Sequence, residues 1–489
     1  MAEKLVVYKK NDVHLIISCE DWMAFELSDY FKFRVPGAHF IPSVRNKTWD
    51  GYIRLFDRRD NTLYCGLLPY VEKFAVDREY EITLDKSIEP AEEFSVKEAK
   101  DFLDTLNLPM KPRDYQVKNF VDAVRNRRNL FVSPTASGKS LVIYMLTRFY
   151  DTKTLIIVPT TSLVSQMSTD FAEYAKNIDW PDEDLIHQIT AGADKTSTKP
   201  IVISTWQSIY KLKKNSFPDY NLVFGDEAHL FTAKSLTSIM EKLEDCPYRY
   251  GMTGTLDGTK THKLVLEGLF GPVKEVATTK ELIKQKHLSD FRIKCLVLNY
   301  DEEVCRGLRK STYKEEMDFL VGHPGRNAFI RNLTLSLEGN TLLLFQYVDK
   351  HGRILHDLIE EKNDDSSRKL WFVYSGTSKE DREQIRKITE TERNAIIVAS
   401  FGTFSTGINI RNLHNIIFAS PTKSRIRNLQ SIGRGLRKGD QKTMATLFDI
   451  SDDLSIKKHK NYTLKHFIER VGIYNGEQFN YRMYKVKMK

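Results

Sequence analysis

The sequence predicts an α/β protein in which two doubly wound parallel-sheet lobes follow one another and a small α+β domain precedes them. Short apolar runs rich in β-branched residues alternate with amphipathic helical stretches after residue 112, and the alternation resumes after residue 290. Near-continuous apolar strands between helices indicate parallel sheets covered on both faces, and two such series indicate two lobes. The strand-like runs are 130–133, 155–159, 201–204, 222–224 and 250–253 in the first series, and 341–347, 370–374, 395–400, 416–419 and 445–449 in the second.

The segment ahead of the lobes has a different pattern. Residues 1–85 mix short strand-like runs with one helical stretch near residues 20–31, and an acidic segment with prolines follows, which we interpret as a linker. The predicted organisation is a small α+β domain for nucleic-acid or substrate recognition with its acidic linker (1–95), a first, nucleotide-binding lobe (96–285), a second lobe (286–451) and a basic C-terminal extension (452–489).

Composition argues against several other classes of protein. No apolar run reaches the roughly 18 residues of a membrane span, and the N-terminus lacks the apolar core of a signal peptide, so we expect a cytoplasmic protein. The five cysteines are odd in number and form no C-x-x-C pair, which argues against a disulfide framework and a zinc site. The net charge of +9 is unevenly spread, because residues 1–95 hold 13 basic and 17 acidic side chains whereas residues 451–489 hold 9 and 4. Such a balance is consistent with a polyanionic partner.

The first candidate site is a phosphate-binding loop. Residues 133–140, Ser-Pro-Thr-Ala-Ser-Gly-Lys-Ser, follow a strand-like run and open a helical one, which is the context that such a loop requires. Backbone N–H groups at the helix N-terminus would hold the phosphates of ATP. Lys139 would neutralise phosphate charge and the Ser140 hydroxyl would ligate Mg²⁺, although Ser133 replaces the first glycine of the strict pattern. The nucleotide-binding residues predicted here are Thr135, Ala136, Ser137, Gly138, Lys139 and Ser140.

A carboxylate pair and an arginine motif complete a hydrolytic set. Asp226 and Glu227, in the sequence Asp-Glu-Ala-His, follow a buried strand-like run. Asp226 would hold Mg²⁺ through water, and Glu227 would orient and deprotonate the attacking water. Residues 430–437, Gln-Ser-Ile-Gly-Arg-Gly-Leu-Arg, lie in the second lobe, where arginine fingers would make hydrolysis depend on lobe closure. The catalytic residues predicted are Lys139, Asp226, Glu227, Gln430, Arg434 and Arg437, and the cofactors are ATP and Mg²⁺.

With further motifs in the same order, the chain resembles a superfamily 2 helicase with two RecA-like lobes. Residues 113–116 resemble the adenine-reading Q motif, residues 158–166 and 205–208 the two motifs that touch the nucleic-acid backbone, and residues 251–255 motif III. Residues 341–346 and 399–409 resemble motifs IV and V, although Asn409 stands where motif V commonly has Asp. The resemblance implies nucleotide contacts at Arg113, Gln116 and Gly407, backbone contacts at Pro159, Thr160, Thr205, Trp206 and Gln207, and coupling of hydrolysis to strand grip at His229, Thr253 and Thr255.

The smaller motifs also have structural interpretations. Thr205 and Trp206 fit ordinary packing at a strand end, Thr253 and Thr255 fit helix caps, and Gln116 fits a surface glutamine. Order and spacing, rather than any single motif, favour the helicase interpretation.

The variants in two motifs favour DNA as the polymer. DEAD-box RNA helicases usually have Ser-Ala-Thr in motif III and Arg-Glu-Leu in motif Ia, whereas this chain has Thr-Gly-Thr and, from Thr161, Thr-Ser-Leu-Val. The chain most resembles the branched-DNA remodelling helicases of T-even phages. The resemblance implies ATP-dependent action on Holliday junctions, stalled forks, D-loops and R-loops in recombination, replication and repair. It also implies a monomer in the infected cell's cytoplasm that binds branched DNA, single-stranded DNA, an RNA–DNA hybrid and a single-strand binding protein, with no membrane. An RNA helicase, a double-strand translocase and a nucleotide-gated clamp remain alternatives.

Basic and aromatic residues cluster in the N-terminal domain although the domain as a whole is acidic. The alternation suits phosphate contact together with base stacking. A β-hairpin with a solvated charged face and Trp49 in the core is the alternative. The basic tail is a second candidate for backbone contact, and a frayed solubilising end is its alternative; its residues are Lys457–Lys460, Lys485, Lys487 and Lys489. The N-terminal residues of this prediction are Arg45, Lys47, Trp49, Arg58 and Arg59.

Overall fold

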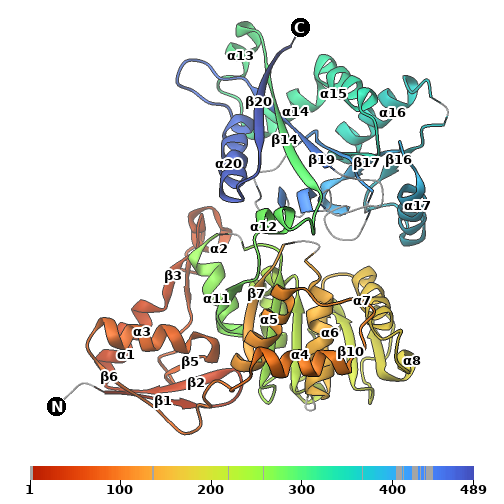
Figure 1. Cartoon of the computed structure of the whole chain (residues 1–489). Coiled ribbons are helices and arrows are strands. Elements are labelled where there is room, and N and C mark those ends of the chain that lie inside the picture. Colours follow the sequence, from red (N-terminus) through yellow and green to blue (C-terminus); the bar gives the residue numbers. More distant parts are fainter. Residues whose placement is uncertain are drawn as a thin grey trace. The chain divides into compact units, whose positions relative to one another are not determined.

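The computed structural model of the chain divides into two compact units (Figure 1). One unit comprises residues 1–133 and 138–276, and the other comprises residues 134–137 and 277–489. Among the described residues, no helix is both long and apolar enough to span a bilayer. The structure describes residues 4–488 except 135–136, 218–219, 257, 366, 404–409, 411, 421–423, 425–427, 430, 434–435 and 437–443.

The first unit begins with the small α+β domain that the sequence predicts. Its four-stranded sheet has the order β5-β2-β1-β6, in which β1 is antiparallel to β2 and parallel to β6. Leu5 and Val7 alternate with more exposed residues along β1, so one face of the sheet is buried beneath the helices. The elements are β1 (Lys4–Lys9), β2 (His14–Ser18), α1 (Asp21–Tyr30), β3 (Lys32–Arg34), α2 (Pro42–Arg45), β4 (Tyr52–Arg54), β5 (Thr62–Tyr64), α3 (Leu68–Asp77) and β6 (Glu81–Leu84).

A seven-stranded sheet forms the rest of this unit. Its order is β13-β7-β12-β11-β8-β10-β9, and every pair in it is parallel. The inner strands β8 and β10 are buried along their whole length, as expected for a parallel sheet covered on both faces. The strands are β7 (Arg128–Val132), β8 (Thr154–Val158), β9 (Ile186–Ile189), β10 (Ile201–Thr205), β11 (Leu222–Asp226), β12 (Tyr248–Thr253) and β13 (Val273–Glu275). The helices are α4 (Val96–Thr105), α5 (Asp114–Asn126), α6 (Lys139–Tyr150), α7 (Thr161–Tyr174), α8 (Asp182–Leu185), α9 (Trp206–Ile209), α10 (Lys234–Lys242) and α11 (Lys260–Phe270).

The small domain and this sheet share one hydrophobic core. Leu5 and Phe74 of the small domain belong to the same buried cluster as Leu130 and Phe270 of the larger one. Two tyrosine hydroxyls cross the boundary, since Tyr64 donates to Glu241 and Tyr70 to Glu267, each over 2.6 Å. The small domain is therefore packed on the first lobe rather than tethered to it.

The second unit contains a second seven-stranded sheet whose strand pairs are also all parallel, with the order β16-β17-β15-β18-β19-β14-β20. Two parallel sheets behind a small α+β domain confirm the predicted fold class. The strands are β14 (Asp290–Asn299), β15 (Thr341–Phe345), β16 (Leu370–Val373), β17 (Ile396–Ser400), β18 (Asn415–Phe418), β19 (Met444–Asp453) and β20 (Tyr481–Lys487). The helices are α12 (Thr279–Lys284), α13 (Glu302–Leu308), α14 (Tyr313–Gly322), α15 (Pro324–Ser336), α16 (Ile354–Glu361), α17 (Lys379–Thr391) and α20 (Tyr462–Gly476).

The C-terminal segment belongs to this second sheet. Strand β20 pairs in parallel with β14 from Ile293↔Tyr481 to Asn299↔Lys487, at the sheet's edge. Helix α20 is fixed by Arg470, whose buried guanidinium donates to Asp449 of β19 from two nitrogens at 2.9 and 2.8 Å. The alternative of a frayed tail is therefore wrong for Lys485 and Lys487, which lie in the paired strand β20.

Candidate functional site

The predicted motifs of the first lobe meet at one edge of its sheet. Because all seven strands run parallel, their carboxyl ends lie together. Three neighbouring strands, β7, β12 and β11, end at the phosphate-binding loop, at Thr253 and at Asp226, in that order across the sheet. The next two strands, β8 and β10, end at Val158 and Thr205, which are partners in the sheet register. The nucleotide motifs and the backbone-contacting motifs thus occupy adjacent halves of a single edge.

The phosphate-binding loop requires its glycine. Gly138 has a φ of +80°, and a Cβ added there would lie 2.4 Å from the side-chain nitrogen of Gln116. Helix α6 starts directly after it, and the Lys139 ammonium donates to the carbonyl of Ser133 at the loop's other end, over 3.3 Å. The Ser140 hydroxyl lies 2.8 Å from that of Tyr174. Thr135 and Ala136 of this prediction lie outside the described residues.

Gln116 is buried beneath this loop and is 4% exposed, so the alternative of a surface glutamine is wrong. Its side-chain oxygen accepts from the backbone N–H of Arg113 (2.8 Å), and its nitrogen donates to the Gly138 carbonyl (3.4 Å). The Arg113 guanidinium donates to the Tyr115 hydroxyl over 2.7 Å. Gln116 therefore joins the start of α5 to the glycine of the loop. Its contact with adenine stays a prediction.

Asp226 and Glu227 lie where strand β11 ends. Burial and the neighbouring Glu227 carboxylate raise the pKa of Asp226 to about 6, against the opposing effects of Lys139 and His229. Glu227 has a left-handed backbone with φ of 51°, a conformation that costs a non-glycine residue about 1–3 kcal/mol and often marks functional sites. A strained turn with two adjacent carboxylates destabilises the fold, because the backbone is strained and the charges repel each other. Such a turn is instead typical of a site that binds a cation.

A hydrogen-bonded relay leads from this pair to motif III. The buried imidazole of His229 places Nδ1 3.2 Å from a Glu227 carboxylate oxygen and 3.0 Å from the Thr253 hydroxyl. The Thr253 hydroxyl donates to the Thr255 carbonyl (3.0 Å), so it must accept from His229, and Nδ1 carries the proton. One N–H therefore links the DEAH turn to motif III. The backbone N–H of Ser133 donates to the Thr253 carbonyl over 2.8 Å, which joins the phosphate-binding loop to the same point.

The helix-cap alternative for motif III is wrong. Helix α11 begins at Lys260, and its cap is the side chain of Thr259, which accepts from the backbone N–H of His262. Thr253 ends strand β12 with its side chain fully buried, and the Thr253 hydroxyl also accepts from the Thr255 N–H over 3.4 Å. Both threonines thus belong to a turn beside the DEAH segment. Their coupling role remains a prediction.

The two candidate backbone-contacting motifs lie side by side. Thr160 caps helix α7 by accepting from Leu163, and the buried Thr205 hydroxyl lies 2.9 Å from that of Ser208. The Gln207 amide donates to the Pro159 carbonyl over 3.3 Å and so ties one motif to the other. Trp206 packs half-buried against the hydrophobic core and edge-on to Tyr210. Strand-end packing therefore describes Thr205 and Trp206 correctly, and their contact with nucleic acid is left as a prediction.

The exposed basic side chains of the N-terminal domain differ in whether they contact another side chain. Arg59 forms an ion pair with Asp57, and the Arg58 guanidinium stacks 3.4 Å from the ring centre of Phe25. Arg45 and Lys47 are exposed at the end of α2 and just beyond it. Trp49 is half-buried and donates to the Tyr52 carbonyl over 3.0 Å, beside the β3–β4 hairpin. The hairpin alternative holds for the backbone, and all four cations are exposed to solvent, although Arg58 and Arg59 each also have a protein partner.

Comparison with known proteins places the whole chain in one family. The chain matches, in order, DNA helicase UvsW, N-terminal (residues 6–85), Type III restriction enzyme, res subunit (109–258), and Helicase conserved C-terminal domain (325–439). It is 35% identical over 501 residues to the ATP-dependent DNA helicase uvsW of Enterobacteria phage T4, covering 97% of this chain and 98% of the relative. The chain belongs to the UvsW family of superfamily 2 helicases. The crystal structure of T4 UvsW agrees, at 34% identity, 99% coverage of both chains and a TM-score of 0.52.

The comparisons also find more distant matches to this UvsW-family chain. The DNA 3'-5' translocase XPB2 of Sulfurisphaera tokodaii is 24% identical over 72% of this chain and 85% of its own length. A fragment of a putative HsdR subunit of a type I restriction enzyme from Vibrio vulnificus matches 89% of this chain and 76% of its own with a TM-score of 0.58, but at 16% identity it supports the fold alone.

The second lobe of the UvsW-family chain presents its motifs on neighbouring strands. Motif IV covers β15, and motif V begins on β17, its partner in the sheet. Gly407, Asn409, Gln430, Arg434 and Arg437 lie outside the described residues, so their roles remain predictions from the sequence.

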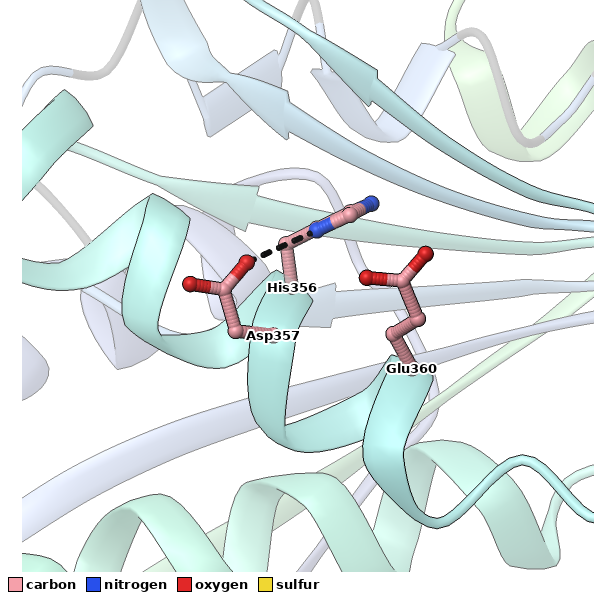
Figure 2. A group of neighbouring side chains, drawn as sticks. All are labelled: His356, Asp357 and Glu360. Atoms are coloured by element: carbon pink, nitrogen blue, oxygen red, sulfur yellow. Dashed lines mark hydrogen bonds and ion pairs between the residues drawn. The ribbon is translucent and has the colours of Figure 1, made fainter.

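One group of potential metal ligands lies on α16 (Figure 2). His356, Asp357 and Glu360 bring ligand atoms within 4.8 Å of one another, and within the described part of the chain this is the one such group. His356 Nδ1 and Asp357 Oδ1 lie 3.1 Å apart. Both acids are exposed to solvent, so an ordinary helix surface explains the group.

Two residues near the site escaped the sequence analysis. Tyr174 meets the Ser140 hydroxyl from the far end of α7, and His262 of α11 reaches the DEAH turn, with Nε2 2.9 Å from the His229 carbonyl. Neither belongs to a helicase motif, and both contacts arise from the packing of helices that are distant along the chain. No local pattern could have indicated them.

Proposed function

We propose that this UvsW-family chain is an ATP-dependent DNA helicase or translocase that remodels branched nucleic acids, such as Holliday junctions, stalled forks, D-loops and R-loops. The observation that carries the proposal is the division of one sheet edge. A hydrogen-bonded network of the residues proposed for hydrolysis occupies the ends of β7, β12 and β11, and the two linked turns proposed to contact nucleic acid occupy the ends of β8 and β10.

ATP and Mg²⁺ fit the side chains at the first half of the edge. The Ser140 hydroxyl and the Asp226 carboxylate are hard oxygen ligands of the kind that Mg²⁺ prefers, and they would hold the ion. Mg²⁺ would neutralise phosphate charge, and the Lys139 ammonium would do the same after leaving the Ser133 carbonyl. Glu227 would take the proton of the attacking water. One oxygen of that carboxylate lies 3.2 Å from His229 Nδ1.

The relay supplies a way for hydrolysis to change the grip on nucleic acid. When Glu227 gains a proton from water, its attraction for the His229 N–H weakens, and that N–H turns towards Thr253. Thr253 in turn bonds to Thr255 and, through its carbonyl, to Ser133 of the phosphate-binding loop. His229, Thr253 and Thr255 therefore act as the coupling group of this proposal.

Nucleic acid would lie across the second half of the edge. Pro159, Thr160, Thr205, Trp206 and Gln207 form the adjoining turns, and backbone N–H groups at helix starts favour phosphate there. In the N-terminal domain, Arg45 and Lys47 are free to contact phosphate, whereas Arg58 and Arg59 would first have to leave Phe25 and Asp57. We propose the first two as the stronger contacts and Trp49 as their aromatic neighbour.

The remaining expectations belong to the same proposal. Arg434 and Arg437 act as arginine fingers, Gln430 and Gly407 contribute to the nucleotide site, and Arg113 and Gln116 read the adenine. The protein acts as a monomer in the cytoplasm of an infected bacterium, with a single-strand binding protein as a further partner.

ATP turnover measured with four polymers tests the proposal. We expect little turnover without nucleic acid or with RNA, and strong stimulation by a Holliday junction and by single-stranded DNA. Lys139→Ala should abolish turnover, whereas Lys118→Ala, which changes an exposed lysine on α5, should not. Stimulation by RNA alone would support the RNA helicase instead, turnover with duplex DNA but no strand separation the translocase, and no turnover with any polymer the clamp.

A further inference from the structure

Helix α11 contacts the DEAH turn near its start and the N-terminal domain near its end. Its first turn presents His262 to the DEAH segment, and its last turns carry Glu267 and Gly268 at the domain boundary. Five residues separate His262 from Glu267, which at about 1.5 Å per residue is about 7–8 Å along the axis. Helix α11 also follows motif III after a short segment. It is thus a short, rigid element between two parts of the molecule to which the motifs give separate tasks.

The contact at the end of α11 is between backbones. A Cβ added to Gly66 would lie 1.9 Å from the carbonyl oxygen of Glu267 and 2.8 Å from that of Gly268. Conversely, a Cβ on Gly268 would meet the Tyr64 ring at 2.9 Å. At Gly66 the two backbones touch with no side chain between them, and at Gly268 the Tyr64 ring packs directly on the helix backbone. A displacement of the N-terminal domain towards α11 would therefore displace the helix.

Tyr70 adds a directional bond at the same place. The Tyr70 hydroxyl donates to one oxygen of Glu267 over 2.6 Å, and the other oxygen accepts from the backbone N–H of Val273 over 3.0 Å. Glu267 is 3% exposed, so the bonds to its carboxylate are shielded from water. One buried carboxylate thus joins the N-terminal domain, α11 and strand β13.

The contact at the start of α11 fixes the DEAH turn. A carbonyl oxygen only accepts, so His262 Nε2 carries the proton and donates to the His229 carbonyl over 2.9 Å. The other end of His229 holds Glu227 and Thr253 through Nδ1. His262 therefore holds the backbone of the residue whose side chain joins the proposed catalytic base to motif III.

We propose that α11 transmits the state of the N-terminal domain to the DEAH turn, with His262 as a positioning residue and the Tyr70–Glu267 bond as the point of entry. The inference rests on the proposed function, because it assumes hydrolysis at Glu227 and a nucleic-acid contact on the N-terminal domain. It adds that DNA held by this domain sets the rate of hydrolysis within the same unit. The N-terminal domain then controls turnover as well as substrate choice.

Three substitutions at residue 262 test the positioning role. His262→Leu should lower the DNA-stimulated kcat about tenfold, the effect of losing one shielded hydrogen bond, and leave KM for ATP unchanged. His262→Gln should restore the rate, because its amide nitrogen reaches the place of imidazole Nε2. His262→Asn, which is one bond shorter, should not. Equal rates for the Gln and Asn variants, or full activity of the Leu variant, would overturn the role.

Tyr70→Phe tests the entry point. It removes one hydroxyl, and we expect stimulation by a Holliday junction to fall about fivefold while turnover without DNA and the Kd for the junction stay unchanged. Tyr80→Phe is the matched control, since the Tyr80 hydroxyl donates to Glu26 inside the N-terminal domain over 2.9 Å. Equal stimulation of the Tyr70→Phe variant and the unaltered chain would refute the inference.

A double-mutant cycle connects the two ends. If α11 carries the coupling, the losses of stimulation in Tyr70→Phe and His262→Leu do not add, because the second change interrupts a path already broken. Additive losses would show two independent effects and overturn the proposal. The unaltered chain separates this from the proposed function: if DNA does not stimulate its turnover, the function itself fails, whereas a stimulated chain with additive variants refutes only the coupling.

Discussion

Both large sheets carry carboxylates on an inner strand, fully buried in the second sheet and half-buried at the strand end in the first, and the two sets are neutralised differently. Asp449 and Asp452 of β19 each accept two bonds from an arginine, Arg470 and Arg326, and one from a tyrosine hydroxyl, Tyr474 and Tyr300. Asp226 of β11 has no arginine ion pair in the described part of the chain, and burial beside Glu227 raises its pKa to about 6.

The difference distinguishes carboxylates that stabilise the fold from carboxylates that we expect to bind a ligand. A buried charge whose oxygens are all satisfied by protein groups stabilises one arrangement and has nothing left to offer. A buried charge left partly unsatisfied costs stability, and a protein retains it where a cation or a reacting group completes it. Four experiments sharpen this comparison, from the largest expected effect to the smallest.

Glu227→Gln should give the largest effect, on rate alone. It keeps the shape of the side chain and removes the base, so ATP turnover should fall about 10²–10⁴-fold while ATP binding persists. Single-turnover hydrolysis beside a nucleotide-binding titration measures both. Glu173→Gln, on an exposed face of α7, is the control. Near-normal turnover in Glu227→Gln would remove this acid from the chemistry.

Arg470→Leu should give the largest effect on stability. It leaves the Asp449 charge buried without its arginine, which costs about 3–5 kcal/mol of unfolding free energy. Denaturant unfolding followed by a probe in the second unit measures it. Replacing Asp449 by Leu as well should recover most of the loss, because no unpaired charge remains. An unfolding free energy of Arg470→Leu that differs from that of the unaltered chain by less than about 1 kcal/mol, the usual effect of a point substitution, would contradict the comparison.

Asp226→Asn should separate function from stability. Burial and the neighbouring Glu227 disfavour the ionised form of Asp226 and raise its pKa, so removing this carboxylate should raise the unfolding free energy at pH 7, where the group is ionised. ATP turnover should be lost at the same time. If Asp226→Asn destabilised the chain as Arg470→Leu does, Asp226 would be a structural acid after all.

Arg45→Ala and Arg59→Ala compare a basic side chain without a protein partner and one with a partner, and we expect them to give the smallest effects. Arg45 is exposed and forms no ion pair among the described residues, whereas Arg59 pairs with Asp57. Affinity for DNA falls with salt, and the slope of log affinity against log salt reflects the number of phosphate contacts. Losing Arg45 should make this slope less steep by about 1, as expected for one lost phosphate contact, and losing Arg59 should change it less. Binding to one branched substrate at several salt concentrations measures both slopes. Equal slopes would mean that the Asp57 pair opens readily on DNA.

The sequence predicted what depends on local pattern. Apolar β-branched runs located the strands, and the rule that parallel strands present ligands at their carboxyl ends located the loop at Gly138 and the acids at Asp226 and Glu227. The relay from His229 to Thr253 fits the family motifs, yet its hydrogen bonds depend on β11 and β12 being neighbours, which is a property of the fold.

Other features escaped because their causes are distant along the chain. The partner of Ser140 is Tyr174, and that of the His229 carbonyl is His262, neither of which lies in a motif. In the sequence, strand β20 resembles a basic tail, because most of its residues are exposed and its apolar and polar residues alternate only weakly. Its partner in the sheet, β14, lies far earlier in the chain. Gln116 is buried because a glycine faces it, which no local pattern reveals.

The core shared by the N-terminal domain and the first lobe has a practical consequence for anyone wishing to dissect the enzyme. Cutting the chain between residues 85 and 96 would uncover Leu130 and Phe270 along with the rest of their buried cluster, and would strip α11 of its backbone partner at Gly66. The shortened protein would expose this hydrophobic surface to solvent and tend to aggregate. Loss of activity after such a cut would reflect damage to the lobe as much as the missing domain. Single side-chain substitutions at the boundary therefore separate the two effects better than truncation does.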